Sequence, residues 1–247
     1  MVRFCFLVCL CVSATAFGQT SIITTTPTAA GFAVVPAIFD PGDGDLIPSG
    51  WIEGIGCPTK QLIAIYPSTK RNGAYMEPGC PTGDPRDTEN TGLLLVKGGP
   101  TNDNASSGAN IVGVQGVVLK ELGYDFRRGL HCGAGSPRFD IDTADGKSYF
   151  LGCNSPVATS TTPAATTPYP ASATSGFVRL RWGGTSPLQA YNASTGNLET
   201  VASQVKHLSI VFDEGQDTGP DFTGMAILDN IDVNGVLVGL GSLGFIF

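Results

Sequence analysis

Charged residues are scarce in this chain of 247 residues. They make up 14% of it, against about 25% in an average soluble domain. Coiled coils and helical bundles need abundant Glu, Lys, Ala and Leu, so the composition disfavours both classes. The chain has only two histidines, and G-x-S-x-G, H-E-x-x-H and P-loop motifs do not occur in it. The sequence therefore predicts a protein that is not an enzyme.

Long hydrophobic runs are also lacking, because the apolar stretches 4–12 and 236–247 are shorter than the about 20 residues that cross a bilayer. The first stretch follows Arg3 and precedes the small-residue cleavage site Ala14-Thr15-Ala16. Residues 1–18 are therefore typical of a secretory signal peptide, which predicts a secreted, extracellular protein. The formal net charge of −7 disfavours nucleic acid and anionic lipid as partners.

Glycine and proline are abundant instead, at 33 and 17 residues, and they separate short runs of alternating apolar and polar residues. This pattern predicts an all-β protein, a two-sheet antiparallel jelly-roll sandwich with long loops. Hairpin turns are expected at Asn72-Gly73, Asp145-Gly146 and Asn234-Gly235. The expected strands are 32–39, 61–66, 93–97, 111–119, 122–127, 139–143, 148–153, 177–182, 205–212, 225–233 and 236–240.

One domain over residues 32–247 accounts for these strands, after an extended Thr-rich segment at 19–31. Residues 155–176 consist almost wholly of Ser, Thr, Ala and Pro and predict a long mobile loop inserted in the sandwich. The alternative is a linker between two domains. The apolar residues 236–247 predict a terminal strand of the same sandwich, and the alternative is a strand donated to a neighbouring subunit.

Four cysteines follow the signal segment. An even number in an exported chain predicts two disulfides, for which three pairings are open. We favour the local pairs, Cys57 with Cys80 and Cys132 with Cys153, because each closes a loop the size of a hairpin. A zinc site is the alternative, but no C-x-x-C pair is present and histidine is scarce.

Two acidic clusters lie beside glycines and are candidate calcium sites. Carboxylate oxygens suit calcium, and loops allow them to converge. The alternative is a solvated turn in which Asp and Gly serve turn geometry alone. The candidate metal ligands are Asp213, Asp217 and Asp221 in the second cluster, which also holds Glu214, and Asp40 and Asp43 in the first, beside Asp45.

Aromatic residues in or near the expected loops are candidate ligand-binding residues, because a flat ring stacks on a sugar ring. Trp51, Trp182 and Tyr191 are the three that we select, and Tyr75 and Tyr169 are further loop aromatics. The alternative is that they belong to the core, as large aromatic side chains more often do.

The stretch Ile227-Leu228-Asp229-Asn230-Ile231-Asp232-Val233-Asn234-Gly235 resembles the last strand of jelly-roll carbohydrate-binding modules of the galactose-binding-like type. The resemblance implies a structural calcium that joins an early acidic loop to Asp229, through Asp40 or Asp43. Other blocks are similar to uncharacterised secreted bacterial proteins, namely Gly56-Cys57-Pro58-Thr59, Cys132-Gly133-Ala134-Gly135-Ser136-Pro137-Arg138-Phe139 and residues 212–220.

These observations predict a secreted binding protein whose ligand is a glycan or a cell-surface polymer. A structural subunit of an extracellular layer or fibre is the first alternative, favoured by low charge, disulfides and the apolar C-terminus. It would self-associate. A secreted glycoside hydrolase that uses carboxylates is the second alternative.

Overall fold

The computed structural model describes residues 31–57, 84, 86, 87, 89–99, 105–133, 135–153, 155, 156, 159–161, 176–213, 223–241 and 244–246. This part of the chain forms strands and no helix, and so has no helix that could cross a membrane. The strands are β1 (Ala33–Phe39), β2 (Ser49–Ile52), β3 (Gly92–Lys97), β4 (Ser106–Val112), β5 (Glu121–Arg127), β6 (Arg138–Thr143), β7 (Ser148–Gly152), β8 (Thr159–Thr161), β9 (Phe177–Gly183), β10 (Gln189–Asn192), β11 (Leu198–Thr200), β12 (Val205–Phe212), β13 (Gly224–Val233), β14 (Val236–Val238) and β15 (Gly244–Ile246).

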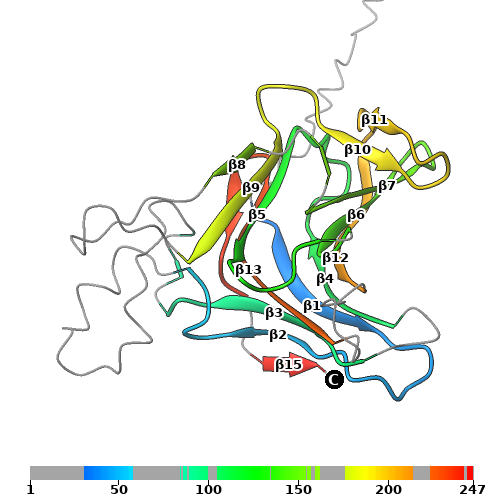
Figure 1. The fold of residues 1–247 in the computed structure, drawn as a ribbon. Coiled ribbons are helices and arrows are strands. Elements are labelled where there is room, and N and C mark those ends of the chain that lie inside the picture. Colours follow the sequence, from blue (N-terminus) through cyan, green and yellow to red (C-terminus); the bar gives the residue numbers. More distant parts are fainter. Residues whose placement is uncertain are drawn as a thin grey trace, which may run out of the picture.

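The strands build two antiparallel sheets that pack face to face (Figure 1). The seven-stranded sheet has the order β1-β4-β12-β6-β7-β10-β11. The eight-stranded sheet has the order β15-β2-β3-β13-β5-β9-β8, and β14 pairs with β13 beside β3. The structure therefore confirms an all-β protein made of two antiparallel sheets.

Alternation along each strand creates the core between the sheets. In β6, Phe139 and Ile141 are buried while their neighbours face outward, as a period of two residues requires. Tyr124, Phe139 and Trp182 meet at the centre, with ring centroids 5.4–6.2 Å apart. Such aromatic pairs add to the stabilisation that burial alone provides.

Strand β13 occupies the middle of the eight-stranded sheet, between β3 and β5. It is the longest strand, with ten residues, and its pairing with β5 shifts between Asp229 and Asp232. Asn230 lies in this irregularity with a φ of 46°, a conformation that Asn adopts more readily than most residues. The bulge directs the side chains of Asp229, Asn230 and Asp232 to different hydrogen-bond and ion-pair partners.

The hairpin expected at Asn234-Gly235 is confirmed. The two residues have φ values of 54° and 83°, as a tight two-residue turn requires. The Asn234 side chain also bridges to the loop before β5, where its Oδ1 accepts from the backbone N–H of Lys120 at 2.6 Å and its Nδ2 donates to the carbonyl of Val118 at 3.0 Å.

Some predicted boundaries were wrong. The strand expected at 111–119 ends at Val112, because Gly113 and Gly116 have φ values of 88° and 80°, which an extended strand does not allow. Within the segment expected as a loop at 155–176, Thr159–Thr161 pairs with β9. The expected strand 61–66, the turn at Asn72-Gly73 and residues 1–30 lie outside the described residues.

The ends of the sandwich are tied down in two ways. Near the C-terminus, β15 pairs with β2 of the same chain, which confirms the prediction of a terminal strand. A disulfide joins Cys132 and Cys153, 21 positions apart, and so links the loops on either side of the β6–β7 hairpin. The second predicted disulfide includes Cys80, which lies outside the described residues.

Candidate functional site

The register of the seven-stranded sheet places one residue from each strand in a single line across its outer face. Their neighbours along the strands, such as Ile141, Tyr149, Leu151 and Ala190, point into the core, so the line faces away from it. We call this line the outer row. It consists of Val35, Asn110, Ser209, Asp140, Phe150, Tyr191 and Leu198.

Phe150 and Tyr191 form the aromatic part of the outer row. They lie directly opposite each other on β7 and β10, and residues in this position have Cβ atoms about 4.5–5.5 Å apart. The side chain of Phe150 is 38% exposed and that of Tyr191 is half-buried. With Leu198, which lies opposite Tyr191 on β11, they make a continuous apolar strip across three strands.

Arg138 borders this strip. Its guanidinium lies 5.0 Å from the centroid of the Phe150 ring, a cation–π distance. It donates to Asp140 at 2.8 Å through Nε, and to both carboxylate oxygens of Asp213 at 2.6 and 2.7 Å. Burial raises the pKa of Asp140, and the charge of Arg138 opposes that effect. The group is thus a fixed array of donors and acceptors beside an aromatic ring.

Polar side chains border the other side of the outer row. Ser148 donates to Oδ1 of Asp142 at 2.6 Å, and Nε2 of His207 lies 3.3 Å from Oδ1 of Asn110. The side chains of His207 and Asp142 are each 50% exposed and lie 3.8 Å apart. An apolar strip between two polar borders suits a ligand with apolar ring faces and hydroxyl edges, which is the chemistry of a sugar.

Two of the three aromatic residues selected from the sequence lie elsewhere. Trp51 and Trp182 are 1% and 0% exposed and belong to the core. Trp51 is fixed there by its indole N–H, which donates to the carbonyl of Val34 at 3.0 Å. Neither indole presents a face to solvent, so of the three only Tyr191 is accessible to a ligand. Tyr75 and Tyr169 lie outside the described residues.

Phe150 was not selected from the sequence, although a signal for it was present. In the expected strand 148–153 the side chains of Tyr149 and Leu151 point inward. Phe150 therefore occupies an outward position, where a polar residue is expected. A large aromatic residue in an outward position indicates a contact surface only when a neighbour extends it into a patch, as Tyr191 does here.

The described carboxylates of the candidate calcium sites are separated and bound to N–H donors. Asp213 binds Arg138, and Oδ2 of Asp40 accepts from the backbone N–H groups of Gly44 and Asp45, each at 3.0 Å. Within the described ranges, no three His, Cys, Asp or Glu side chains form a metal-binding group. Asp43 has a φ of 50° in the turn after β1, while Asp217 and Asp221 lie outside those ranges.

Among the described residues, the carboxylate of Asp229 accepts hydrogen bonds from Cys57 and Asn230 and not from the loop that holds Asp40 and Asp43. Its carboxylate is fully buried and accepts from the backbone N–H of Cys57 at 2.6 Å and of Asn230 at 2.5 Å. Burial, with the charges of Asp87 and Asp125, raises its pKa well above the ordinary value. The residues described around Asp229 thus use it as an anchor for backbone amides.

An ion-pair network covers the outer face of the eight-stranded sheet. Arg179 binds both oxygens of the fully buried Asp125, at 2.8 and 2.7 Å. Arg181 lies between Asp125 and Asp232, with Nη2 3.4 Å from the first and Nε 2.9 Å from the second. Buried charges are stable only when they are paired in this way, so this face is a structural element and a poor candidate for ligand exchange.

No family model, curated protein or solved structure matches the chain.

Proposed function

We propose that this chain is a secreted, non-enzymatic binding protein that holds a glycan or cell-surface polymer against the outer row. The observation that carries the proposal is the pairing of Phe150 with Tyr191 on an accessible sheet face. Adjacent strands lie about 4.8 Å apart, so the strip from Phe150 through Tyr191 to Leu198 is about 10 Å long. That length suits neighbouring rings of one saccharide chain.

The borders of the strip supply hydrogen bonds to hydroxyl groups. Asp142 and His207 are half exposed, and Asp140 is held in place by Arg138. Because these groups are already fixed by the sheet and by one another, a ligand would lose little affinity to ordering the site. Arg138 faces the two carboxylates of Asp140 and Asp213, so the group carries no excess positive charge and favours an uncharged polyhydroxylated ligand over an acidic one.

The finer features expected from the sequence belong to the same proposal. A jelly-roll connection of the sheets is supported by the chain's alternation between them, since β3 and β5 lie in one sheet and β4 in the other. A second disulfide between Cys57 and Cys80 would tie the loop after β2. A structural calcium belongs to the same proposal, and Asp213 is a poor ligand for it because both of its carboxylate oxygens bind Arg138.

The test is binding of the purified chain to a panel of neutral and acidic polysaccharides, measured by isothermal titration. Replacing Phe150 and Tyr191 together by Ala is expected to weaken binding at least about tenfold, or about 1.4 kcal/mol. Val35→Ala, at the far end of the same row and also exposed, is the matched control and is expected to bind normally. No binding to any polysaccharide, or equal binding by both variants, overturns the proposal.

The alternative function, a structural subunit of a layer or fibre, is favoured by one observation. The edge strand β1 carries exposed apolar side chains at Val35 and Phe39, 45% and 56% exposed. Single apolar residues are common on surfaces, but a sheet edge that no described strand covers invites self-association. Sedimentation over a range of concentrations separates the two functions, because only the structural subunit assembles without ligand.

A further inference from the structure

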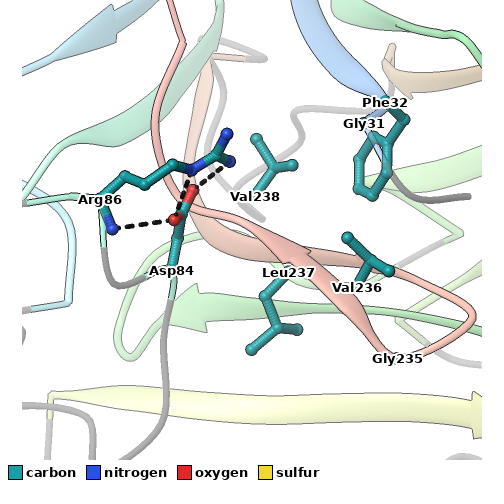
Figure 2. A pocket seen from close by; sticks show the side chains of 8 residues that line it. All are labelled: Gly31, Phe32, Asp84, Arg86, Gly235, Val236, Leu237 and Val238. Carbon is teal, nitrogen blue, oxygen red and sulfur yellow. Dashed lines mark hydrogen bonds and ion pairs between the residues drawn. The ribbon is translucent and has the colours of Figure 1, made fainter.

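A second concave site lies away from the outer row, where the β13–β14 hairpin approaches the segment that enters β1 (Figure 2). Its volume is about 470 Å³, within the range of roughly 300–1,000 Å³ typical of ligand pockets. The lining residues are Gly31, Phe32, Asp84, Arg86, Gly235, Val236, Leu237 and Val238. They combine an apolar wall, one guanidinium group and the edge of a strand.

Within the described part of the chain, no strand pairs with the edge of β14 that faces this pocket. β14 pairs there with β13, in the register Val233 with Val236, Asp232 with Leu237 and Ile231 with Val238. In a two-residue hairpin the residues beside the turn exchange hydrogen bonds, so the next pair does not. The N–H and C=O of Leu237 therefore point away from β13. The N–H of Gly239, two residues on, points the same way and donates to Oδ2 of Asp84 at 3.2 Å.

Arg86 stands at the end of this edge and is held in one orientation. Its Nε and Nη2 donate to the buried carboxylate of Asp84 at 2.8 and 2.7 Å, and its own backbone N–H donates to the same carboxylate at 3.0 Å. The side chain is nevertheless 65% exposed. Arginine has five N–H donors, so the Nη1 end remains available on the pocket side, as Figure 2 shows.

We propose that this pocket receives an extended peptide segment, which adds to the edge of β14 and places a carboxylate on the guanidinium of Arg86. The free N–H and C=O of Leu237 match a peptide backbone, the natural complement of a strand edge. The half-buried side chain of Val236, backed by the buried Phe32 and Val238, supplies an apolar contact for the side chains of such a segment. A charge-assisted hydrogen bond from Arg86 fixes its end. The carboxylate comes from the C-terminus of the peptide or from an acidic side chain.

The experiment measures the binding of fluorescent pentapeptides, randomised over Val, Ile, Thr and Ser, to the full chain by anisotropy. Three forms are compared: a free C-terminal acid, a C-terminal amide, and an amide with Asp in the last position. We expect at least one carboxylate form to bind about tenfold more tightly than the plain amide. Arg86→Gln is expected to remove that difference, while the matched control Lys206→Gln, on an exposed part of β12, retains it.

A second arm tests strand addition without altering the protein. N-methylation of alternate peptide nitrogens removes backbone donors and is expected to weaken binding about tenfold. Equal binding by the methylated peptide, by all three terminal forms or by Arg86→Gln overturns the proposal. It is also overturned if no peptide binds at millimolar concentration, or if sodium decanoate binds more tightly than every peptide, which would indicate a lipid site.

Discussion

The backbone N–H of Cys57 donates to Oδ2 of Asp229 at 2.6 Å, across 172 positions of sequence. This contact ties the loop after β2 to the middle strand of the eight-stranded sheet. On the other side of the same carboxylate, Oδ1 accepts from the N–H of Asn230. One side chain thus accepts from two buried backbone donors.

Replacing Asp229 by Ala is expected to lower the free energy of unfolding by about 1–3 kcal/mol. The substitution removes the carboxylate that accepts from the buried N–H groups of Cys57 and Asn230. Loss of the acceptor of a buried donor costs about 1–3 kcal/mol, offset in part because a buried carboxyl is removed. Urea denaturation measures the change. Glu53→Ala, at an exposed position, is the control and should stay within about 0.5 kcal/mol; similar losses in both variants would refute the anchoring role.

The protein is expected to be more stable at pH 5 than at pH 8. Burial raises the pKa of Asp87 to about 6 and that of Asp232 to about 7, and it also raises the pKa of Asp229. A carboxyl with a raised pKa binds its proton more tightly in the folded chain than in the unfolded chain. Its contribution is complete below about pH 4, and for Asp87 and Asp232 it is lost as the pH rises through about 6 and about 7.

The melting temperature across this range is the measurement for the pH dependence. Asp232→Asn should reduce the difference between pH 5 and pH 8, because one of the responsible groups no longer titrates. A melting temperature that rises steadily from pH 5 to pH 8 would contradict the assignment.

Arg179→Met is expected to destabilise the protein by roughly 2–4 kcal/mol, because it leaves the fully buried Asp125 without its bidentate partner. The expected loss of stability is smaller than the maximum for breaking a buried ion pair, because Arg181 still lies 3.4 Å from Asp125. Lys147→Met, which breaks an exposed ion pair with Glu199, should have little effect on stability, because solvent screens exposed pairs. Chemical denaturation of both variants tests the contrast, and equal losses would mean that burial of Asp125 has no energetic consequence.

Gly108→Ala is expected to cost about 1–3 kcal/mol. A Cβ atom at this position would lie 2.2 Å from the carbonyl oxygen of Ile210 on β12, so the two strands would have to separate. Gly133→Ala is the matched substitution, because a Cβ there meets nothing within 4 Å, and it should be neutral. Thermal unfolding of the pair decides: a stable Gly108→Ala protein would show that β4 and β12 do not approach this closely.

Alternation allowed many strands to be predicted, since in a run such as Phe139–Thr143 the burial of every second residue is already visible in the residue types. It failed for β4, which begins with Ser106-Ser107-Gly108. There the inward side chain of Ser107 is small and polar and yet fully buried, so local residue type does not reveal the strand. Close packing against β12 favours Gly108 over a β-forming residue.

The candidate site was predictable only in part, for a physical reason. Tyr191 could be selected from its own surroundings, but its importance depends on Phe150, and that neighbour is set by the pairing of β7 with β10. Trp51 illustrates the opposite error. Pro48 and Gly54 near it suggest a loop, whereas β2 pairs with β3 and β15 and carries the indole into the core. Pairing between strands far apart in the sequence determines the surroundings of both Tyr191 and Trp51. Such pairing cannot be inferred from the residue pattern of one sequence.

The position of β13 constrains when the protein can fold. The strand at the middle of the eight-stranded sheet comes from residues 224–233, and β15, which pairs with β2 at that sheet's edge, comes from residues 244–246. The ribosome therefore synthesises the central strand of this sheet after most of the other strands in it. Until then β3 and β5 have no common neighbour, so this sheet can be completed only when synthesis is nearly finished.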